Sequence, residues 1–275
     1  MSDSTLEPAF IDGSRGPLFV LLRRPGHRDA VPCALIVPPF AEEMNKTRPM
    51  FTMVARGLAA RGVATILPDL FGTGDSAGEF REGDWQTWQD DLLRAATWAE
   101  AEGCRVDRLL CVRLGCILGA TVAARLPAQV KHTVFWQPVL DGERFMTQFL
   151  RLRVAASMME DRQETVGGLR ERLRGGETLE VAGYELLPTL VTQIADARLA
   201  QGLDGRLGQV HWMEIVRGAE GALPAASQQV IEAAQPNLCS IESHAIPGEP
   251  YWSATEIVRI PTLVERTVGA LAEVA

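Results

Sequence analysis

Short apolar runs rich in β-branched residues alternate along this chain with longer stretches of helical period. This alternation favours parallel strands joined by crossover helices, and runs that are apolar throughout indicate strands covered on both faces. The sequence predicts strands over residues 17–24, 34–37, 64–67, 109–113, 132–136, 210–216 and 238–246. It predicts helices over residues 48–61, 85–102, 116–126 and 260–272. We therefore expect an α/β fold with a mostly parallel, doubly wound sheet.

The middle of the chain differs from this pattern in composition and in the period of its apolar residues. Residues 141–203 are rich in Arg and Glu, are helical by period and contain no convincing strand pattern. We interpret them as a helical cap inserted into a core formed by residues 1–140 and 204–275. We expect large apolar side chains at near-helical spacing to form the packing face of this cap, with a surface that contacts a lipid or an acyl chain as the alternative. These side chains are Phe145, Phe149, Met158 and Met159.

Composition narrows the range of partners. The 275 residues carry 35 acidic and 27 basic side chains, a net charge of −8, which argues against nucleic-acid binders and polybasic membrane-surface proteins. No segment has the roughly 18 uninterrupted apolar residues of a membrane helix. The amino-terminal residues show no secretory signal pattern, so we expect a cytoplasmic protein without membrane insertion. The five cysteines are scattered without metal-ligand spacing, which indicates reduced, buried thiols. We expect neither a metal nor a cofactor, and nothing in the sequence indicates the oligomeric state.

Residues 69–76, which read Asp-Leu-Phe-Gly-Thr-Gly-Asp-Ser, resemble the D-x-x-G-x-G-x-S loop that follows the fourth strand of α/β-hydrolases. Gly72 and Gly74 permit tight turns, and the Ser76 hydroxyl is suited to hydrogen-bond the loop back onto itself. The pattern is complete, so the resemblance implies an α/β-hydrolase fold. It says little about catalysis, because this loop is a scaffold.

The segment Cys111-Val112-Arg113-Leu114-Gly115 lies where α/β-hydrolases have the nucleophile elbow G-x-S-x-G, a strained turn between strand and helix. Gly115 is retained and Cys111 supplies a small residue at the first glycine position, so we expect the turn to form. The nucleophile position holds Arg113, and a guanidinium does not act as an acyl acceptor. An elbow shifted to Cys116 would place leucines at both glycine positions, so we interpret Cys116 as a buried helix residue.

The acid and the histidine of a Ser-His-Asp triad are not recognisable either. After the strand predicted at 210–216, Gly221 stands near the usual aspartate position with Glu220 beside it. The histidine is expected near Pro250, whereas His244 lies six residues earlier, within a strand pattern. We interpret His244 as a structural residue, with an unusually placed base as the alternative. Together these losses indicate that Ser-His-Asp chemistry is not performed, because a general base acts only beside a nucleophile that it can deprotonate.

The run Pro-Pro-Phe-Ala-Glu-Glu-Met-Asn-Lys at residues 38–46 resembles the exosortase A system-associated hydrolases, specifically the group called hydrolase 2. Other segments resemble the same group, namely residues 136–139, 148–153, 181–186 and 248–252. The matches extend over residues 35–252, and an arginine at the elbow is also similar to this group. The resemblance implies an α/β-hydrolase fold encoded with the bacterial PEP-CTERM/exosortase and exopolysaccharide machinery.

The backbone of the expected site is better preserved than its side chains. In α/β-hydrolases the oxyanion hole is formed by the N–H group of the residue after the nucleophile and by one N–H group from the loop after the third strand. The resemblance implies that Leu114 and Phe40 supply these groups in this sequence. With Arg113 between them, the pocket would bind an anion. An internal ion pair of Arg113 with Glu42 or Glu43 is the competing interpretation.

Two functions from different classes follow. The first is a presumptive hydrolase of an ester, a thioester or a glycan substituent, which activates water with Glu43 or His244 as the base. The second is a non-catalytic module that binds an anionic ligand, such as a sugar acid or a carrier phosphate, through Arg113. The family resemblance favours the hydrolase, and the residue chemistry slightly favours the binding module. In both, the partner is a small-molecule or glycan-related ligand, for which Trp136 and Trp252 are alternative stacking surfaces.

Overall fold

The computed structural model describes residues 4–26, 30–159, 163–218, 221–237 and 240–273 and contains an eight-stranded sheet. In spatial order its strands are β1 (Ser4–Asp12), β2 (Pro17–Pro25), β4 (Ala64–Pro68), β3 (Val31–Val37), β5 (Cys104–Val112), β6 (His132–Trp136), β9 (Gln209–Val216) and β10 (Ser240–Pro247). β2 is antiparallel to both β1 and β4, and all pairs from β4 to β10 are parallel. The predicted mostly parallel sheet is confirmed.

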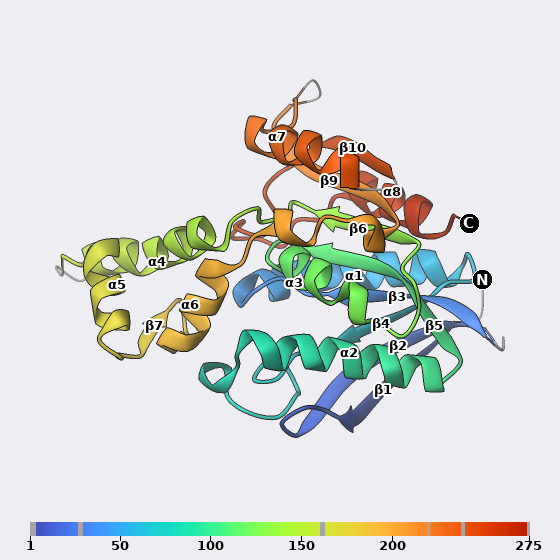
Figure 1. Ribbon diagram of the computed structural model, residues 1–275, viewed down its shortest axis with the longest axis horizontal. Coiled ribbons are helices and arrows are strands. Elements are labelled where there is room, and N and C mark those ends of the chain that lie inside the picture. Colours follow the sequence, from blue (N-terminus) through green and yellow to red (C-terminus); the bar gives the residue numbers. More distant parts are fainter. Residues whose placement is uncertain (1–3, 27–29, 160–162, 219–220, 238–239, 274–275) are drawn as a thin grey trace.

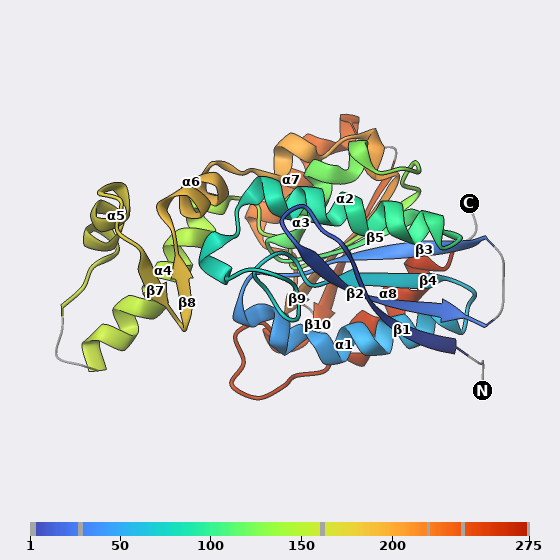
Figure 2. The same cartoon turned by 90° about the horizontal axis from the view of Figure 1, so that it is seen from below.

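Helices cover both faces of this sheet (Figure 2). Two of them, α1 (Glu42–Ala59) and α8 (Pro261–Leu271), lie on one face. The other face carries α2 (Trp85–Ala101), α3 (Gly115–Val122) and α7 (Ala225–Ala234). Every residue of β4 and β6 is buried, as expected of central parallel strands covered on both sides.

A second lobe projects from the core between β6 and β9 (Figure 1). It consists of α4 (Gly142–Met159), α5 (Val166–Arg174), the antiparallel pair β7 (Leu179–Val181) and β8 (Tyr184–Leu186), and α6 (Pro188–Asp196). These elements fall within the predicted cap, but the expectation that the cap has no strand is wrong. Ala182 and Gly183 both have positive φ, 50° and 84°, so a two-residue turn joins strands too short to show a period in sequence.

The predicted strands and helices are present, with shifted ends for some of them. α1 starts at Glu42, earlier than predicted, and β5 starts at Cys104 and ends before Arg113. In the core, β1 and α7 were not expected. β1 is an edge strand that leaves Leu6 and Phe10 exposed, by 49% and 64%, so its apolar residues follow no core pattern. Among the described residues, no helix is long and apolar enough to cross a membrane.

Candidate functional site

The turn between β5 and α3 has the backbone geometry of a nucleophile elbow, with Arg113 at its tip. Arg113 adopts a φ of 56°, in the left-handed region that costs a residue with a side chain about 1–2 kcal/mol. Its N–H donates to the Trp136 carbonyl at 2.9 Å, and its carbonyl accepts from the Cys116 N–H at 3.1 Å. A Cβ at Gly115 would lie 2.5 Å from the Pro38 carbonyl oxygen, so this position requires glycine. The expected turn therefore forms, around an arginine.

The Arg113 guanidinium is held inside the protein by three neighbours. Its Nε and Nη2 both donate to Oε1 of Glu43, at 3.2 and 3.1 Å, and its Nη1 donates to the Gln137 carbonyl at 3.3 Å. The Trp252 ring lies against it, with its centroid 4.6 Å from Cζ, so this ring contacts a cation. Only 12% of the Arg113 side chain and 16% of the Glu43 side chain are exposed. The internal ion pair expected as one alternative is therefore present.

The second oxygen of Glu43 has no hydrogen-bond partner in the part of the chain that the structure describes. Oε2 is buried and makes no hydrogen bond with any described residue. Burial raises the pKa of Glu43 above its usual value, while the charge and hydrogen bonds of Arg113 oppose this shift. Glu43 is therefore a carboxylate that is less acidic than usual, held at the start of α1.

A cavity of about 340 Å³ lies at the carboxyl edge of the sheet, against the cap. Its wall comes from the segment after β3, the loop after β4, the starts of α2 and α3, and β8 of the cap. Five aromatic side chains contribute to this wall, namely Phe40, Phe80, Trp85, Trp88 and Tyr184. Arg48 and Asp69 are its charged residues, whereas Arg113, Glu43 and His244 are not among the described residues that line it. The size and lining are typical of a small-molecule site.

The loop after β4 holds Asp69 in place. Asp69 is 4% exposed, its Oδ1 accepts from Nη2 of Arg48 at 2.6 Å, and its Oδ2 accepts from the Asp75 N–H at 3.1 Å. The Ser76 hydroxyl donates to the Asp69 carbonyl, which confirms the predicted closure of the loop onto itself. A Cβ at Gly74, where φ is 54°, would lie 1.9 Å from Oδ2 of Asp69. The loop is a scaffold that fixes the Arg48–Asp69 pair at the cavity.

Both residues predicted for an oxyanion hole, Phe40 and Leu114, line the cavity. Neither N–H group donates a hydrogen bond to any described residue. The Phe40 ring packs edge-on against Phe145 and Phe149 of α4, with centroids 5.7 and 5.1 Å apart. These contacts join the segment after β3 to the cap.

The predicted packing face of the cap is confirmed only in its first part. Phe145 is buried and Phe149 is partly buried against the core cluster. Met158 is 70% exposed, so its assignment to the packing face is wrong. The last turn of α4 lies at the outer end of the lobe, away from the core (Figure 1). The side chain of Met159 lies outside the described residues.

Two other expectations are corrected by the structure. Glu42 is exposed and accepts a hydrogen bond from the Tyr184 hydroxyl at 3.4 Å, so it connects α1 to the cap. Of the two glutamates, only Glu43 pairs with Arg113. Trp136 is fully buried, and its Nε1 donates to the Thr267 hydroxyl at 2.7 Å. A ring without exposed surface does not stack on a carbohydrate.

The other triad candidates do not join Arg113. His244 lies within β10, where its Nε2 is 3.5 Å from Oε1 of Glu242 and its Nδ1 is 3.3 Å from Nη1 of Arg266. Its described contacts include neither Glu43 nor Arg113. Glu220 lies outside the described residues.

Cys116 is the buried helix residue that its neighbours predicted. Its side chain is fully buried, and its thiol donates to the Cys111 carbonyl at 3.2 Å. Burial raises the pKa of this thiol well above its ordinary value, so the thiolate is not populated at neutral pH.

Solved structures share this architecture. Est1E from Butyrivibrio proteoclasticus, solved with ferulic acid bound, is similar with a TM-score of 0.67 and 18% identity, over 95% of this chain and 96% of that chain. A putative hydrolase from Agrobacterium vitis S4 is similar with a TM-score of 0.62 and 17% identity, over 98% and 100% of the two chains. This chain has the α/β-hydrolase fold. A thioesterase domain from the curacin biosynthetic pathway is similar with a TM-score of 0.57 and 14% identity, over 96% of this chain and 99% of that chain. No family model and no curated protein match the sequence.

Sequence reasoning missed two residues of this α/β-hydrolase-fold site, Arg48 and Tyr184. Arg48 was assigned only to a helix, although an arginine one turn beyond a cavity-forming segment is able to point back toward it. Tyr184 lies in the hairpin, which no sequence period indicated.

Proposed function

We propose that this α/β-hydrolase-fold protein binds a small organic ligand in the cavity against its cap and does not form a covalent serine intermediate. The observation that carries the proposal is the commitment of the elbow tip, Arg113, to Glu43, Gln137 and Trp252. A guanidinium donates hydrogen bonds only and has no role as an acyl acceptor. An enzyme of the usual kind needs a hydroxyl or thiol at this tip and a base beside it.

The lining of the cavity defines the chemistry of the ligand. Its aromatic wall suits a flat or apolar body. Arg48 is 38% exposed, one of its nitrogens is bound to Asp69, and its remaining donors have no acceptor among the described residues. The free N–H groups of Phe40 and Leu114 add two donors. A carboxylate or carbonyl head group fits these donors, with Arg48 rather than Arg113 as the contacting cation. Ferulic acid, which is bound in the Est1E structure, has both a ring and a carboxylate.

The second candidate is a hydrolase that acts on an ester, a thioester or a glycan substituent through water. The free N–H groups of Phe40 and Leu114 favour it, because an oxyanion needs such donors. Similar solved structures also include an esterase domain and a thioesterase domain. The base of this hydrolase would be Glu43, whose raised pKa suits proton abstraction. Against it, Oε2 of Glu43 is buried, and the residue does not line the cavity.

We also propose that the chain belongs to the exosortase A system-associated hydrolase 2 group and acts with the bacterial PEP-CTERM and exopolysaccharide machinery. Support comes from residues 38–46, which carry the resemblance and also form one wall of the cavity. The cavity residues from this run are Pro38, Pro39, Phe40, Ala41, Met44 and Asn45. Because residues 38–46 resemble this group and also line the cavity, we expect the members of the group to bind ligands of the same chemical class.

Ferulic acid is the first ligand to titrate, by calorimetry and by thermal unfolding. We expect saturable binding that raises the unfolding temperature of the wild type, and a loss of affinity of about tenfold or more in Arg48→Met, because a charge-assisted hydrogen bond contributes about 1.5–3 kcal/mol. Arg61→Met, an exposed arginine beyond the far end of α1, is the matched control and should leave affinity unchanged. Loss of affinity in folded Arg113→Ala with none in Arg48→Met would assign the anion to Arg113 instead.

Turnover decides between the two candidates. Acyl esters, thioesters and acetylated sugars are incubated with the wild type and with Glu43→Gln. Rates equal to buffer in both proteins are the result expected of a binding protein. Turnover by the wild type that disappears in a folded Glu43→Gln variant would contradict the binding proposal and support water activation by Glu43.

A further inference from the structure

Three histidines lie on neighbouring strands on the same face of the sheet. In register, β9 pairs His211 with Val134 of β6 and with Glu242 of β10. Paired residues of parallel strands share a face, and alternate residues of one strand do so too, so His132 and His244 lie on this face as well. Apolar residues of α8 pack against the same face. His132 is the first residue of β6, so it lies at the opposite edge of the sheet from the ligand cavity.

Two of these imidazoles are buried and have ring nitrogens without a hydrogen-bond partner among the described residues. His132 is 4% exposed and neither of its ring nitrogens has a hydrogen-bond partner; His211 is 3% exposed and its Nε2 has none, among the described residues. Buried polar nitrogens are nearly always paired, because losing water without a replacement costs about 1–3 kcal/mol each. A neutral imidazole presents one nitrogen lone pair, which is able to bind a metal ion. The unpaired nitrogens of His132 and His211 therefore indicate a bound ligand.

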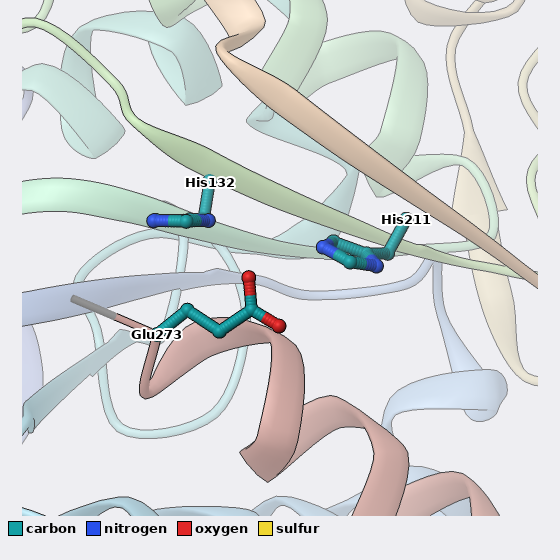
Figure 3. Close-up of side chains that lie close together, drawn as sticks. All are labelled: His132, His211 and Glu273. Atoms are coloured by element: carbon teal, nitrogen blue, oxygen red, sulfur yellow. The ribbon is translucent and has the colours of Figure 1, made fainter. Parts of the chain in front are cut away.

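The Glu273 carboxylate completes a three-residue cluster. Figure 3 shows the side chains of His132, His211 and Glu273 projecting into one space; they come from β6, from β9 and from the second residue after α8. One ligand atom from each lies within 4.8 Å of the other two. Arg108, itself 5% exposed, donates to the carbonyls of Leu271 and Glu273 at 2.6 and 3.1 Å. These bonds attach the backbone at the end of α8 to the sheet and keep residue 273 near the histidines.

We propose that His132, His211 and Glu273 bind a divalent transition-metal ion, with zinc as the best fit, at the edge of the sheet opposite the cavity. Two imidazoles and one carboxylate form a ligand set that zinc accepts, with a fourth position left for water. Zinc lies about 2.0–2.2 Å from such ligands, so small side-chain rotations close the cluster around the ion. The site would fasten the carboxyl end of α8 to β6 and β9.

The groups around the cluster are compatible with a cation. The positive charge of Arg108 is paired with the buried carboxylate of Asp107. Nδ1 of His211 faces Oε2 of Glu242 at 3.6 Å, and a carboxylate behind a ligating histidine is the usual outer neighbour in metal sites. Glu242 also forms a second cluster with His211 and His244. Since His211 belongs to both clusters, the test must separate them.

The experiment is zinc and cobalt titration of the full chain after dialysis against a chelator. We expect one zinc per chain by elemental analysis, visible d–d absorption on Co²⁺ addition, and a rise in unfolding temperature with zinc. Glu273→Gln changes an exposed residue after the last helix, so the variant should fold. We expect it to bind zinc at least about tenfold more weakly, and folded His132→Gln to do the same.

His244→Asn is the matched control, because it removes a histidine of the second cluster alone. It should retain wild-type zinc affinity. Zinc binding lost in His244→Asn but kept in Glu273→Gln would overturn the assignment in favour of the second cluster. Absence of stoichiometric zinc in the wild type, or equal affinity in the wild type and Glu273→Gln, would overturn the proposal.

Discussion

Arg113 contacts Glu43 through one carboxylate oxygen: two nitrogens of the guanidinium donate to Oε1 of Glu43, at 3.2 and 3.1 Å. The contact joins the tip of the β5–α3 turn to the first turn of α1. It occupies the position at which other proteins of this fold present a nucleophile. The elbow residue therefore forms a buried ion pair that links the β5–α3 turn to α1, and both of these border the cavity.

Removing one partner of this pair should destabilise the fold. We expect Arg113→Ala to lower the free energy of unfolding by about 3 kcal/mol, because it leaves the Glu43 carboxylate buried without its counter-charge. Release of the left-handed strain at this position is a smaller, opposing effect. Urea denaturation monitored by circular dichroism measures the difference, with Arg61→Ala as the exposed control. A change equal to that of the control would show that the pair contributes nothing.

The raised pKa of Glu43 predicts a pH dependence with a definite sign. Between its unfolded-state value of about 4.3 and its higher folded-state value, the folded protein binds more protons than the unfolded protein. The contribution of Glu43 to stability therefore decreases as pH rises through this window and stays constant above it. Glu43→Gln keeps an acceptor for Arg113 but does not titrate. The stability of the wild type relative to Glu43→Gln should be greatest at low pH, as measured by urea unfolding from about pH 4 to about pH 7. The opposite slope would mean that Arg113 outweighs burial.

Gly74 is expected to tolerate no side chain. Its φ is 54° and a Cβ would lie 1.9 Å from Oδ2 of Asp69, so Gly74→Ala must displace the carboxylate that holds Arg48. We expect a loss of about 1–3 kcal/mol in stability together with weaker ferulic acid binding. Gly176→Ala is the matched control, because φ is also positive there, at 90°, but a Cβ would meet nothing within 4 Å. Equal losses in both variants would assign the whole effect to backbone strain.

The sequence predicted the sheet and the elbow because both depend on local patterns. Apolar runs mark β3 to β6, and Gly115 is required by one close approach to Pro38. Which carboxylate pairs with Arg113 was not predictable, because Glu42 and Glu43 are neighbours and only the start of α1 decides which one faces inward. The strand-end patterns pointed to the edge of the sheet at which the cavity lies.

Contacts between segments that lie far apart in the chain could not be predicted from the sequence. The cavity needs Tyr184 from a hairpin of three-residue strands, and these are too short for an alternation to be recognised. The residues His132, His211 and Glu273 are far apart in the sequence, because they come from two strands and from the segment after α8. Pairing register, which brings β6 beside β9, is what assembles them.

Restoring the missing hydroxyl should not restore catalysis. Arg113→Ser would place a nucleophile at a correctly built elbow tip, but a serine hydroxyl needs a neighbouring base to be deprotonated. The described histidines are committed elsewhere: His244 contacts Glu242 and Arg266, and His132 and His211 lie on the face covered by α8. Arg113→Ala is the matched control, because it removes the same ion pair and adds no hydroxyl. We expect both variants to hydrolyse p-nitrophenyl acetate at the same rate, and the formation of an acyl-enzyme in Arg113→Ser alone would reveal a base near the tip.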